Sequence, residues 1–268
     1  MVSNTVIQGS YDMNILREPV LRALIHDLNL PEDSHGLDNA CGIGLQAIIL
    51  AEEVGPNGHV TGLDISSEIL NVARKIIDEA GVSERVTLKQ GDVAALPFEN
   101  ETFDWALSID AVGYGPGNTL HLLDEMKRVV KSGGMIAVAA WSSEKLLPGY
   151  PELEARLAAT EPGIAPFVRG KEPELHLSRT LGQLRKLRLK ETTAKTYAGS
   201  VFAPLDETSR RALVSLFEMR WPNVEPELSP QDVNEFKRLC SPDSQDFILN
   251  LQDYYACFTY TVFRGKKP

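Results

Sequence analysis

The sequence has few cysteines, no long apolar run and a deficit of positive charge. Its three cysteines, Cys41, Cys240 and Cys257, lie far apart, which fits neither a disulfide framework nor a metal-binding motif. No apolar stretch approaches the roughly 18 residues that a membrane-spanning helix requires. The first residues also lack the basic-then-apolar pattern of a secretion signal. We therefore expect a cytoplasmic protein with no metal site and no membrane partner.

Acidic residues outnumber basic ones, 37 to 27, and the formal net charge is −10. This balance argues against a nucleic-acid backbone as the main partner, because phosphates would be repelled. Residues 179–190 are locally basic, but leucines interleave with the basic residues, which is typical of an amphipathic helix with a solvated face. We expect a small-molecule partner, and the sequence leaves the oligomeric state open. With 268 residues, of which 43% are hydrophobic, the chain is long enough for one large α/β domain or for a domain with a cap.

Strand and helix patterns alternate along the central part of the chain. The apolar patterns predict strands at 35–39, 59–64, 85–90, 104–109 and 135–141, with helices at 45–54, 67–80 and 118–131. Such alternation is typical of a parallel sheet with right-handed crossovers. Ligands of these sheets bind beyond the carboxyl ends of the strands. Four carboxylates lie at or just past those ends, more than packing alone explains: Asp38, Asp64, Asp92 and Asp110.

The flanking segments follow other patterns. Apolar spacing predicts a helix at 13–29 behind a loose arm at 1–12, and prolines interrupt the chain after residue 141. Helices at 176–187, 206–220 and 230–252 and strands at 189–202 and 255–263 follow. We expect three regions. They are an N-terminal arm and helix (1–34), a ligand-binding core (35–141), and a helical cap that includes the last two core strands (142–268).

The first strand leads into a loop of small residues. Ala40, Gly42 and Gly44 occupy every second position, so that a ligand can lie against the backbone. Loop amides before a helix attract anions. Asp38, which closes the strand, indicates that the ligand also carries hydroxyls or a positive charge. Cys41 is expected to be a packing residue, since no histidine lies near it in the sequence.

Four segments resemble the motifs of class I S-adenosylmethionine-dependent methyltransferases. Residues 37–44 are similar to the first motif, 60–66 to the ribose-binding motif, and 91–98 with Phe103-Asp104 to the third. Residues 125–134 resemble the connection between the fourth and fifth strands in the small-molecule branch, which includes ubiquinone and menaquinone biosynthesis enzymes. The resemblance covers about 35–141 and departs from the family at Ala40, where glycine is preferred. It implies an α/β fold with a Rossmann-like, seven-stranded and mostly parallel sheet. Helices would cover both faces, and the last strand would be antiparallel.

The resemblance also implies roles for individual residues. Asp64 would accept hydrogen bonds from the ribose hydroxyls, and Ile65 would lie on the adenine face. Asp92 would accept from the adenine amino group, and Asp38 would hold the ammonium group. The remaining expected cofactor residues are the small loop residues, one backbone amide and two further side chains: Ala40, Gly42, Gly44, Val93, Ser108 and Tyr11.

Methyl transfer depends mainly on alignment, and a general base is optional. Asp110, at the end of the fourth strand, is the preferred candidate for such a base, and Tyr114 and His121 are second choices. We expect acceptor contacts from residues 9–20 and from the cap. Its aromatic residues could line an apolar pocket or form the cap's own core: Trp141, Tyr150, Phe167, Phe202, Trp221, Tyr254 and Tyr255.

Other interpretations fit parts of the pattern. Residues 42–47 also match a G-x-G-x-x-A fingerprint, with Asp64 at the spacing expected of an NAD(P)-dependent oxidoreductase. Against that function, Asp38 would repel a pyrophosphate, a helix precedes the first strand, and Gly91-Asp92 has no role for a dinucleotide. A catalytically silent S-adenosylmethionine-binding protein is a further alternative. Individually, Asp64 could cap a helix and Asp92 could form a turn, while Asp104 is expected to be a structural hydrogen-bond partner.

Overall fold

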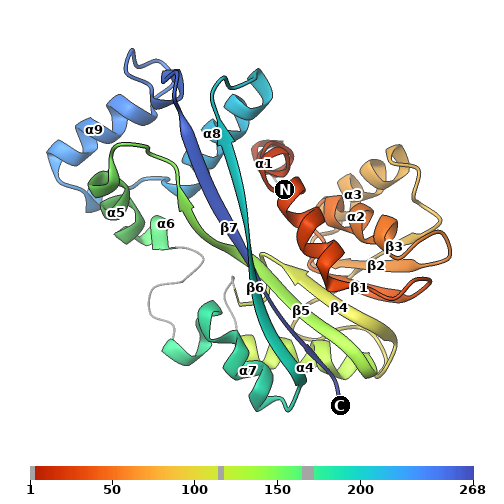
Figure 1. Cartoon of the computed structure of the whole chain (residues 1–268). Helices are drawn as coiled ribbons and strands as arrows, with labels where there is room; N and C mark the ends of the chain where they lie inside the picture. Colours follow the sequence, from red (N-terminus) through yellow and green to blue (C-terminus); the bar gives the residue numbers. More distant parts are fainter. Residues whose placement is uncertain (1–3, 114–117, 165–171) are drawn as a thin grey trace.

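The computed structural model describes residues 4–113, 118–164 and 172–268. Seven strands form one sheet in the order β3-β2-β1-β4-β5-β7-β6 (Figure 1). Strands β1 to β5 pair in parallel, and β7 is antiparallel to both of its neighbours, which confirms the predicted sheet and its antiparallel last strand. The strands are β1 (His35–Asn39), β2 (His59–Asp64), β3 (Val86–Gln90), β4 (Phe103–Ile109), β5 (Val130–Lys145), β6 (Lys190–Phe202) and β7 (Tyr255–Lys266).

Helices cover both faces of the sheet. One buried cluster joins α1, α2, α3 and α8 to one face, and a second joins α4 and α7 to the other. Helices α5, α6 and α9 gather beyond one end of β5 and β7 (Figure 1). The helices are α1 (Asn4–Leu28), α2 (Leu45–Glu53), α3 (Ser67–Glu79), α4 (Thr119–Val129), α5 (Pro151–Ala159), α6 (Glu161–Ile164), α7 (Thr180–Lys186), α8 (Glu207–Arg220) and α9 (Pro230–Cys240). No helix among these described residues is both long enough and apolar enough to cross a membrane.

The first helix starts earlier than predicted. Because α1 begins at Asn4, the prediction of a loose arm was wrong for residues 4–12. The added turns lie against α8 through Asp12, which is only 3% exposed and accepts hydrogen bonds from Arg211 and Ser215. The hydrogen bonds between Asp12 and α8 thus stabilise the first turns of α1, whose sequence lacks regular apolar spacing.

Two other boundaries differ from the predictions. Helix α9 ends at Cys240, so the predicted helix at 230–252 was wrong beyond that residue. Pro242 follows two positions later and cannot donate the backbone hydrogen bond that a continued helix requires. Strand β5 is also longer than predicted, because antiparallel pairing with β7 continues as far as Lys145.

Candidate functional site

Unpaired polar groups are buried at the carboxyl end of β1. Asp38 is 1% exposed, and its Oδ2 has no hydrogen-bond partner among the described residues. Asn39 is completely buried, and neither polar atom of its amide has a described partner. Burial, together with the charge of Asp64, raises the pKa of Asp38 to about 7. A buried polar group without a partner costs about 1–3 kcal/mol, so this end of the strand is suited to a polar ligand.

The loop after β1 has an unusual backbone. Ala40, Gly42 and Gly44 have φ angles of 69°, 54° and 84°. A Cβ atom at Gly42 would meet nothing within 4 Å, so this position faces open space. At Gly44 a Cβ would lie 3.1 Å from Ile77 Cδ1, which shows how closely α3 packs against the loop. The loop therefore presents bare backbone on one side and is supported by α3 on the other.

Asp64 connects this loop to the start of α3. Its Oδ2 accepts a hydrogen bond from the Gly42 N–H at 3.0 Å, and its Oδ1 accepts from the Ser66 N–H at 3.0 Å. The residue that caps α3 is Ser66, whose hydroxyl accepts from the Ile69 N–H. An ionised carboxylate has about four acceptor positions, so Asp64 can still bind ligand hydroxyls. Next to it, Ile65 is 66% exposed, and its side chain is available to an apolar ring.

The third predicted motif forms a tight turn after β3. Asp92 is exposed, and its Oδ1 accepts a hydrogen bond from the Ala94 N–H at 2.8 Å. The turn interpretation of this residue is therefore confirmed. Because Asp92 is exposed and uses Oδ1 for the turn, its Oδ2 can contact a ligand, with Val93 beside it.

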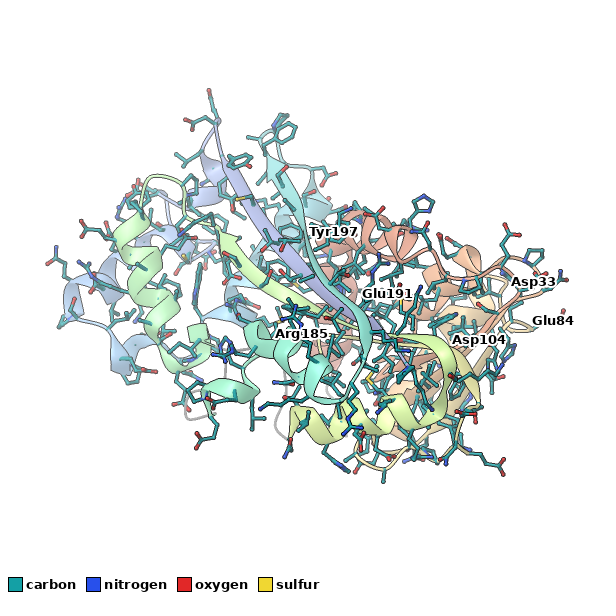
Figure 2. All side chains as sticks on the ribbon, turned by 60° about the horizontal axis from the view of Figure 1, so that its bottom comes forward. Asp33, Glu84, Asp104, Arg185, Glu191 and Tyr197 are labelled. Atoms are coloured by element: carbon teal, nitrogen blue, oxygen red, sulfur yellow. The ribbon has the colours of Figure 1, made fainter. Side chains whose placement is uncertain are left out.

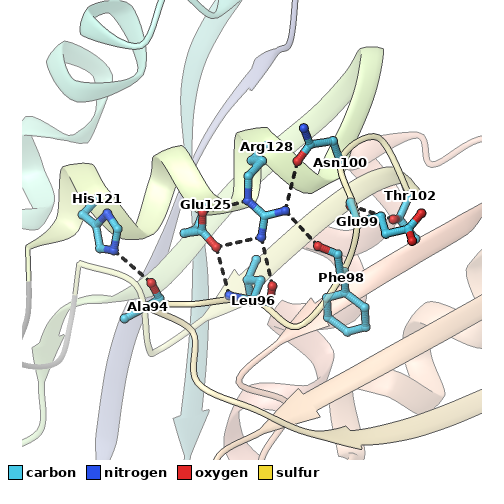
Figure 3. A network of polar contacts seen from close by, with 9 residues as sticks. All are labelled: Ala94, Leu96, Phe98, Glu99, Asn100, Thr102, His121, Glu125 and Arg128. Carbon is cyan, nitrogen blue, oxygen red and sulfur yellow. Dashed lines mark hydrogen bonds and ion pairs between the residues drawn. The ribbon is translucent and has the colours of Figure 1, made fainter.

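Helix α4 holds the same loop in place. Glu125 accepts a hydrogen bond from the Leu96 N–H at 2.9 Å. Arg128 donates to the carbonyl oxygens of Leu96 and Phe98 at 2.9 and 2.8 Å (Figure 3). Because Glu125 and Arg128 also bind each other, the network fixes the loop that carries Asp92.

Other predicted residues have structural contacts. The exposed His121 lies 2.9 Å from the Ala94 carbonyl through Nε2, which links α4 to the loop (Figure 3) and gives no support to a catalytic role. Ser108 is buried and accepts from the Val112 N–H at 3.3 Å.

Asp104 has the structural role that the sequence predicted. It accepts a hydrogen bond from the His35 N–H and pairs with Lys131, both at 2.8 Å, at the start of β4 (Figure 2). Tyr114 lies outside the described residues. The described residues contain no cluster of three or more potential metal ligands.

A cavity of about 860 Å³ lies beyond the carboxyl end of β4, between α1 and α8. Its volume is in the range of small-molecule sites. Tyr11 is on α1 and 37% exposed, and it does not line this cavity. The lining residues come mainly from α1 and α8, with one residue each from β5 and β7: Gln8, Gly9, Ser10, Asp12, Met13, Arg17, Asp110, Trp141, Ser215, Glu218, Met219, Arg220 and Tyr260.

Asp110 lies in the wall of this cavity and has a left-handed backbone, with φ of 54°. Its Oδ1 accepts from the Trp141 N–H at 2.9 Å, and its Oδ2 accepts from the Tyr260 hydroxyl at 2.7 Å. Arg17 Nη1 lies 3.4 Å from the same Oδ2. Burial raises the pKa of Asp110, although Arg17, Tyr260 and the Trp141 amide oppose that rise. A carboxylate with a raised pKa and a free acceptor position can receive a proton.

Sequence reasoning missed Asn39, Arg17 and Tyr260. Alternation along β7 could have indicated the side of the sheet on which Tyr260 lies, because every second residue from Ala256 to Val262 is buried on the α1 and α8 face. The proximity of Tyr260 to Asp110, 150 positions away in sequence, had no local signal. Among the aromatic residues predicted for the cap, Trp141 lines the cavity, whereas Phe167 lies outside the described residues.

A family model described as a methyltransferase domain matches residues 31–182, more than half of the chain. The chain belongs to this methyltransferase family. Demethylmenaquinone methyltransferase from Listeria welshimeri is 36% identical over 129 residues, 47% of this chain and 52% of the relative. The enzyme of the same name from Staphylococcus aureus is 35% identical over 137 residues, 50% of this chain and 54% of the relative. The chain thus spans about half the length of these curated relatives.

Solved structures share the fold of the family at low sequence identity. The YcgJ protein from Bacillus subtilis has a TM-score of 0.56 at 19% identity, over 92% of this chain and 97% of that one. Phosphoethanolamine N-methyltransferase 2 from Haemonchus contortus, in complex with S-adenosyl-L-methionine, has a TM-score of 0.54 at 16% identity. That comparison covers 96% of this chain and 56% of the other. At these identities the likeness is one of fold.

Proposed function

We propose that this protein transfers a methyl group from S-adenosylmethionine to a small-molecule acceptor. The observation that carries the proposal is the family match over residues 31–182, within which Asp38 and Asn39 are buried with polar atoms that have no described partner. In this proposal the cofactor lies across the carboxyl ends of β1 and β2. The acceptor occupies the cavity beside Asp110.

The residues at the strand ends fit the cofactor. S-adenosylmethionine supplies a methyl group on a positively charged sulfur, and the negative charges of Asp38 and Asp64 suit a cationic ligand. Asp64 would accept from the ribose hydroxyls and Ile65 would cover the adenine ring. The other residues proposed to contact the cofactor are Ala40, Gly42, Gly44, Asp92, Val93, Ser108 and Tyr11.

The same geometry argues against a dinucleotide. The Gly42 N–H, which would face a pyrophosphate, already donates to Asp64, and the Gly44 N–H donates to the Cys41 carbonyl at 3.0 Å. Two carboxylates, Asp38 and Asp64, also lie at this loop, where they would repel a phosphate group.

The cavity combines apolar surface with the carboxylate of Asp110 in its wall. Trp141, Met13 and Met219 supply apolar surface, and their packing would exclude water and align the acceptor. Asp110 is the proposed general base. The named substrate of the relatives, demethylmenaquinone, is one candidate for such an acceptor.

Further features of the protein are part of the same proposal. We place it in the cytoplasm, because all three cysteines are free thiols. Its acidic charge supports small-molecule rather than nucleic-acid binding. The division into regions 1–34, 35–141 and 142–268 stays a prediction.

Calorimetric titration with S-adenosylmethionine, S-adenosylhomocysteine and NADH tests the ligand assignment. We expect both adenosyl compounds to bind and NADH to give no heat. Asp64→Ala should weaken cofactor binding by about 1–3 kcal/mol, because charged hydrogen bonds are lost. Asp124→Ala, on the exposed face of α4, serves as the matched control and should bind normally. Tight NADH binding without adenosylmethionine heat would contradict the proposal.

Turnover distinguishes an enzyme from a silent binding protein. S-adenosylhomocysteine release should be measured with a panel of phenols, amines, thiols and quinols. We expect release with at least one class, and a loss of turnover in Asp110→Asn with cofactor binding retained. Cofactor binding without release across the whole panel would indicate a silent binding protein.

A further inference from the structure

Three segments that are distant in sequence meet at the carboxylate of Asp110. Arg17 comes from α1, Tyr260 from β7, and Asp110 follows β4. The Tyr260 hydroxyl donates to Oδ2 at 2.7 Å, and Arg17 Nη1 lies 3.4 Å from the same atom. All three residues line the cavity that we assign to the acceptor.

Tyr260 is fixed as a hydrogen-bond donor. It is 1% exposed, and its ring packs edge-on against Trp141 with centroids 5.6 Å apart. Burial and the neighbouring Asp110 carboxylate raise the pKa of its hydroxyl well above the ordinary value. The hydroxyl therefore keeps its proton at neutral pH and directs it at Asp110.

Two of the other charged residues that line the cavity, Asp12 and Arg220, form ion pairs. On α1, Asp12 pairs with Arg211 at 2.9 Å. On α8, Arg220 pairs with Glu144 of β5 at 2.6 Å. Glu218 of α8 also lines the cavity.

The Asp110 carboxylate contacts the guanidinium of Arg17, the Tyr260 hydroxyl and the Trp141 amide. These three donors oppose the effect of burial, which alone would favour the neutral acid.

We propose that Tyr260 and Arg17 are positioning residues, which favour the ionised form of the Asp110 carboxylate against the effect of burial and turn it toward the acceptor. The proposal rests on the function assigned above. Asp110 then has one acceptor position left for the proton of the acceptor group. The bond between that proton and the acceptor atom breaks, its electron pair stays on the acceptor atom, and an O–H bond forms on Asp110. The proton subsequently leaves to solvent.

Carboxyl NMR of protein labelled with ¹³C at the aspartate side chain measures this effect without any ligand. The Asp110 signal is identified by its absence from Asp110→Asn. In Tyr260→Phe we expect its titration to move to higher pH, because a donor that favours the ionised form is lost. Tyr197→Phe is the matched control (Figure 2), since the Tyr197 hydroxyl also donates to a carboxylate, Asp27, at 2.8 Å. An unchanged titration in Tyr260→Phe, or an equal movement in the control, would overturn the proposal.

Arg17→Gln supplies a second, independent variant and should move the titration in the same direction. The NMR titration needs neither cofactor nor acceptor. It can therefore contradict the roles of Tyr260 and Arg17 while the methyl-transfer assay supports the proposed function, and it can support those roles while that assay finds no methyl transfer. Once an acceptor is found, the acid limb of the kcat profile should move to higher pH in Tyr260→Phe and stay in place in Tyr197→Phe. A uniform fall in kcat at every pH would indicate a merely structural role and overturn the proposal.

Discussion

Ala40 has a backbone conformation that suits glycine, with φ of 69°. An L-residue in the left-handed region is strained by about 1–2 kcal/mol. Ala40→Gly should therefore raise the free energy of unfolding by about 0.5–1 kcal/mol, after the added entropy of the unfolded chain is subtracted. Urea denaturation of the protein without ligand measures this change.

The control for this prediction is the same substitution in a helix. Ala23 is exposed on α1, and Ala23→Gly should lower stability by about 1 kcal/mol. If the free energy of unfolding rises in Ala40→Gly and falls in Ala23→Gly, the gain at Ala40 comes from the conformation of the loop backbone. A loss of stability at both positions would show that Ala40 is not strained.

The buried carboxyl of Asp38 predicts a link between ligand binding and proton release. Since burial raises its pKa to about 7, the free folded protein holds this proton at about pH 6, where the unfolded chain has released it. Its contribution to stability is therefore greatest at acidic pH and declines as the pH rises through 7. A cationic ligand favours the carboxylate, so binding of S-adenosylmethionine at about pH 6 should release up to one proton.

Calorimetry in phosphate and in imidazole detects the released proton, because the two buffers differ in ionisation enthalpy. We expect different binding heats for the unmodified protein and equal heats for Asp38→Asn. Equal heats in both buffers for the unmodified protein would show that Asp38 is already ionised before binding.

At the scale of elements, α1 depends on α8 for its first turns. Asp12 accepts hydrogen bonds from Gln8, Arg211 and Ser215 at 3.0, 2.9 and 3.0 Å. Asp12→Ala removes these bonds and should increase amide hydrogen exchange in the first half of α1, with about 1–3 kcal/mol lost in local stability. Exchange in α4 should not change, and Asp124→Ala should have no effect in either helix.

The same contact has a defined pH dependence. Burial raises the pKa of Asp12, but the hydrogen bonds from Arg211, Gln8 and Ser215 outweigh burial and lower it overall. The stabilisation is thus present at neutral pH and is lost as the pH falls below about 4. The difference in exchange between Asp12→Ala and the unmodified protein should therefore shrink in acid, and a constant difference would contradict this account.

Elements with a local signal were predictable, and those that depend on distant contacts were not. The core strands and helices followed from apolar periodicity, turn residues and caps such as Ser66. The sequence placed Asp38 at the end of the first strand, where the structure has it, but gave no sign that its side chain is only 1% exposed. The start of α1 was missed because it depends on the contacts of Asp12 with Arg211 and Ser215 of α8. The contact of Arg17 and Tyr260 with Asp110 was missed because only the tertiary fold brings them together.

At the scale of the whole molecule, the last strand lies inside the sheet. Strand β7 pairs with β5 on one side and β6 on the other, and it buries Phe258, Tyr260 and Val262. Each such side chain contributes about 1.5–3 kcal/mol on burial, and these contributions together rival the usual net stability of a domain, about 5–15 kcal/mol. Truncation after Asp253 should therefore abolish cooperative thermal unfolding, as followed by circular dichroism. Removal of Pro268 alone is the control, and cooperative unfolding of the truncated chain near the normal Tm would refute the prediction.

The family match and the acceptor cavity occupy different stretches of the chain. The match covers residues 31–182, whereas every residue that lines the cavity except Asp110 and Trp141 lies outside it. Under the proposed function, the residues that hold the methyl donor and those that select the acceptor therefore lie largely on separate stretches of the chain. The proposed function then predicts that a chimaera that takes α1 and α8 together from a relative has a different acceptor range and keeps the same donor.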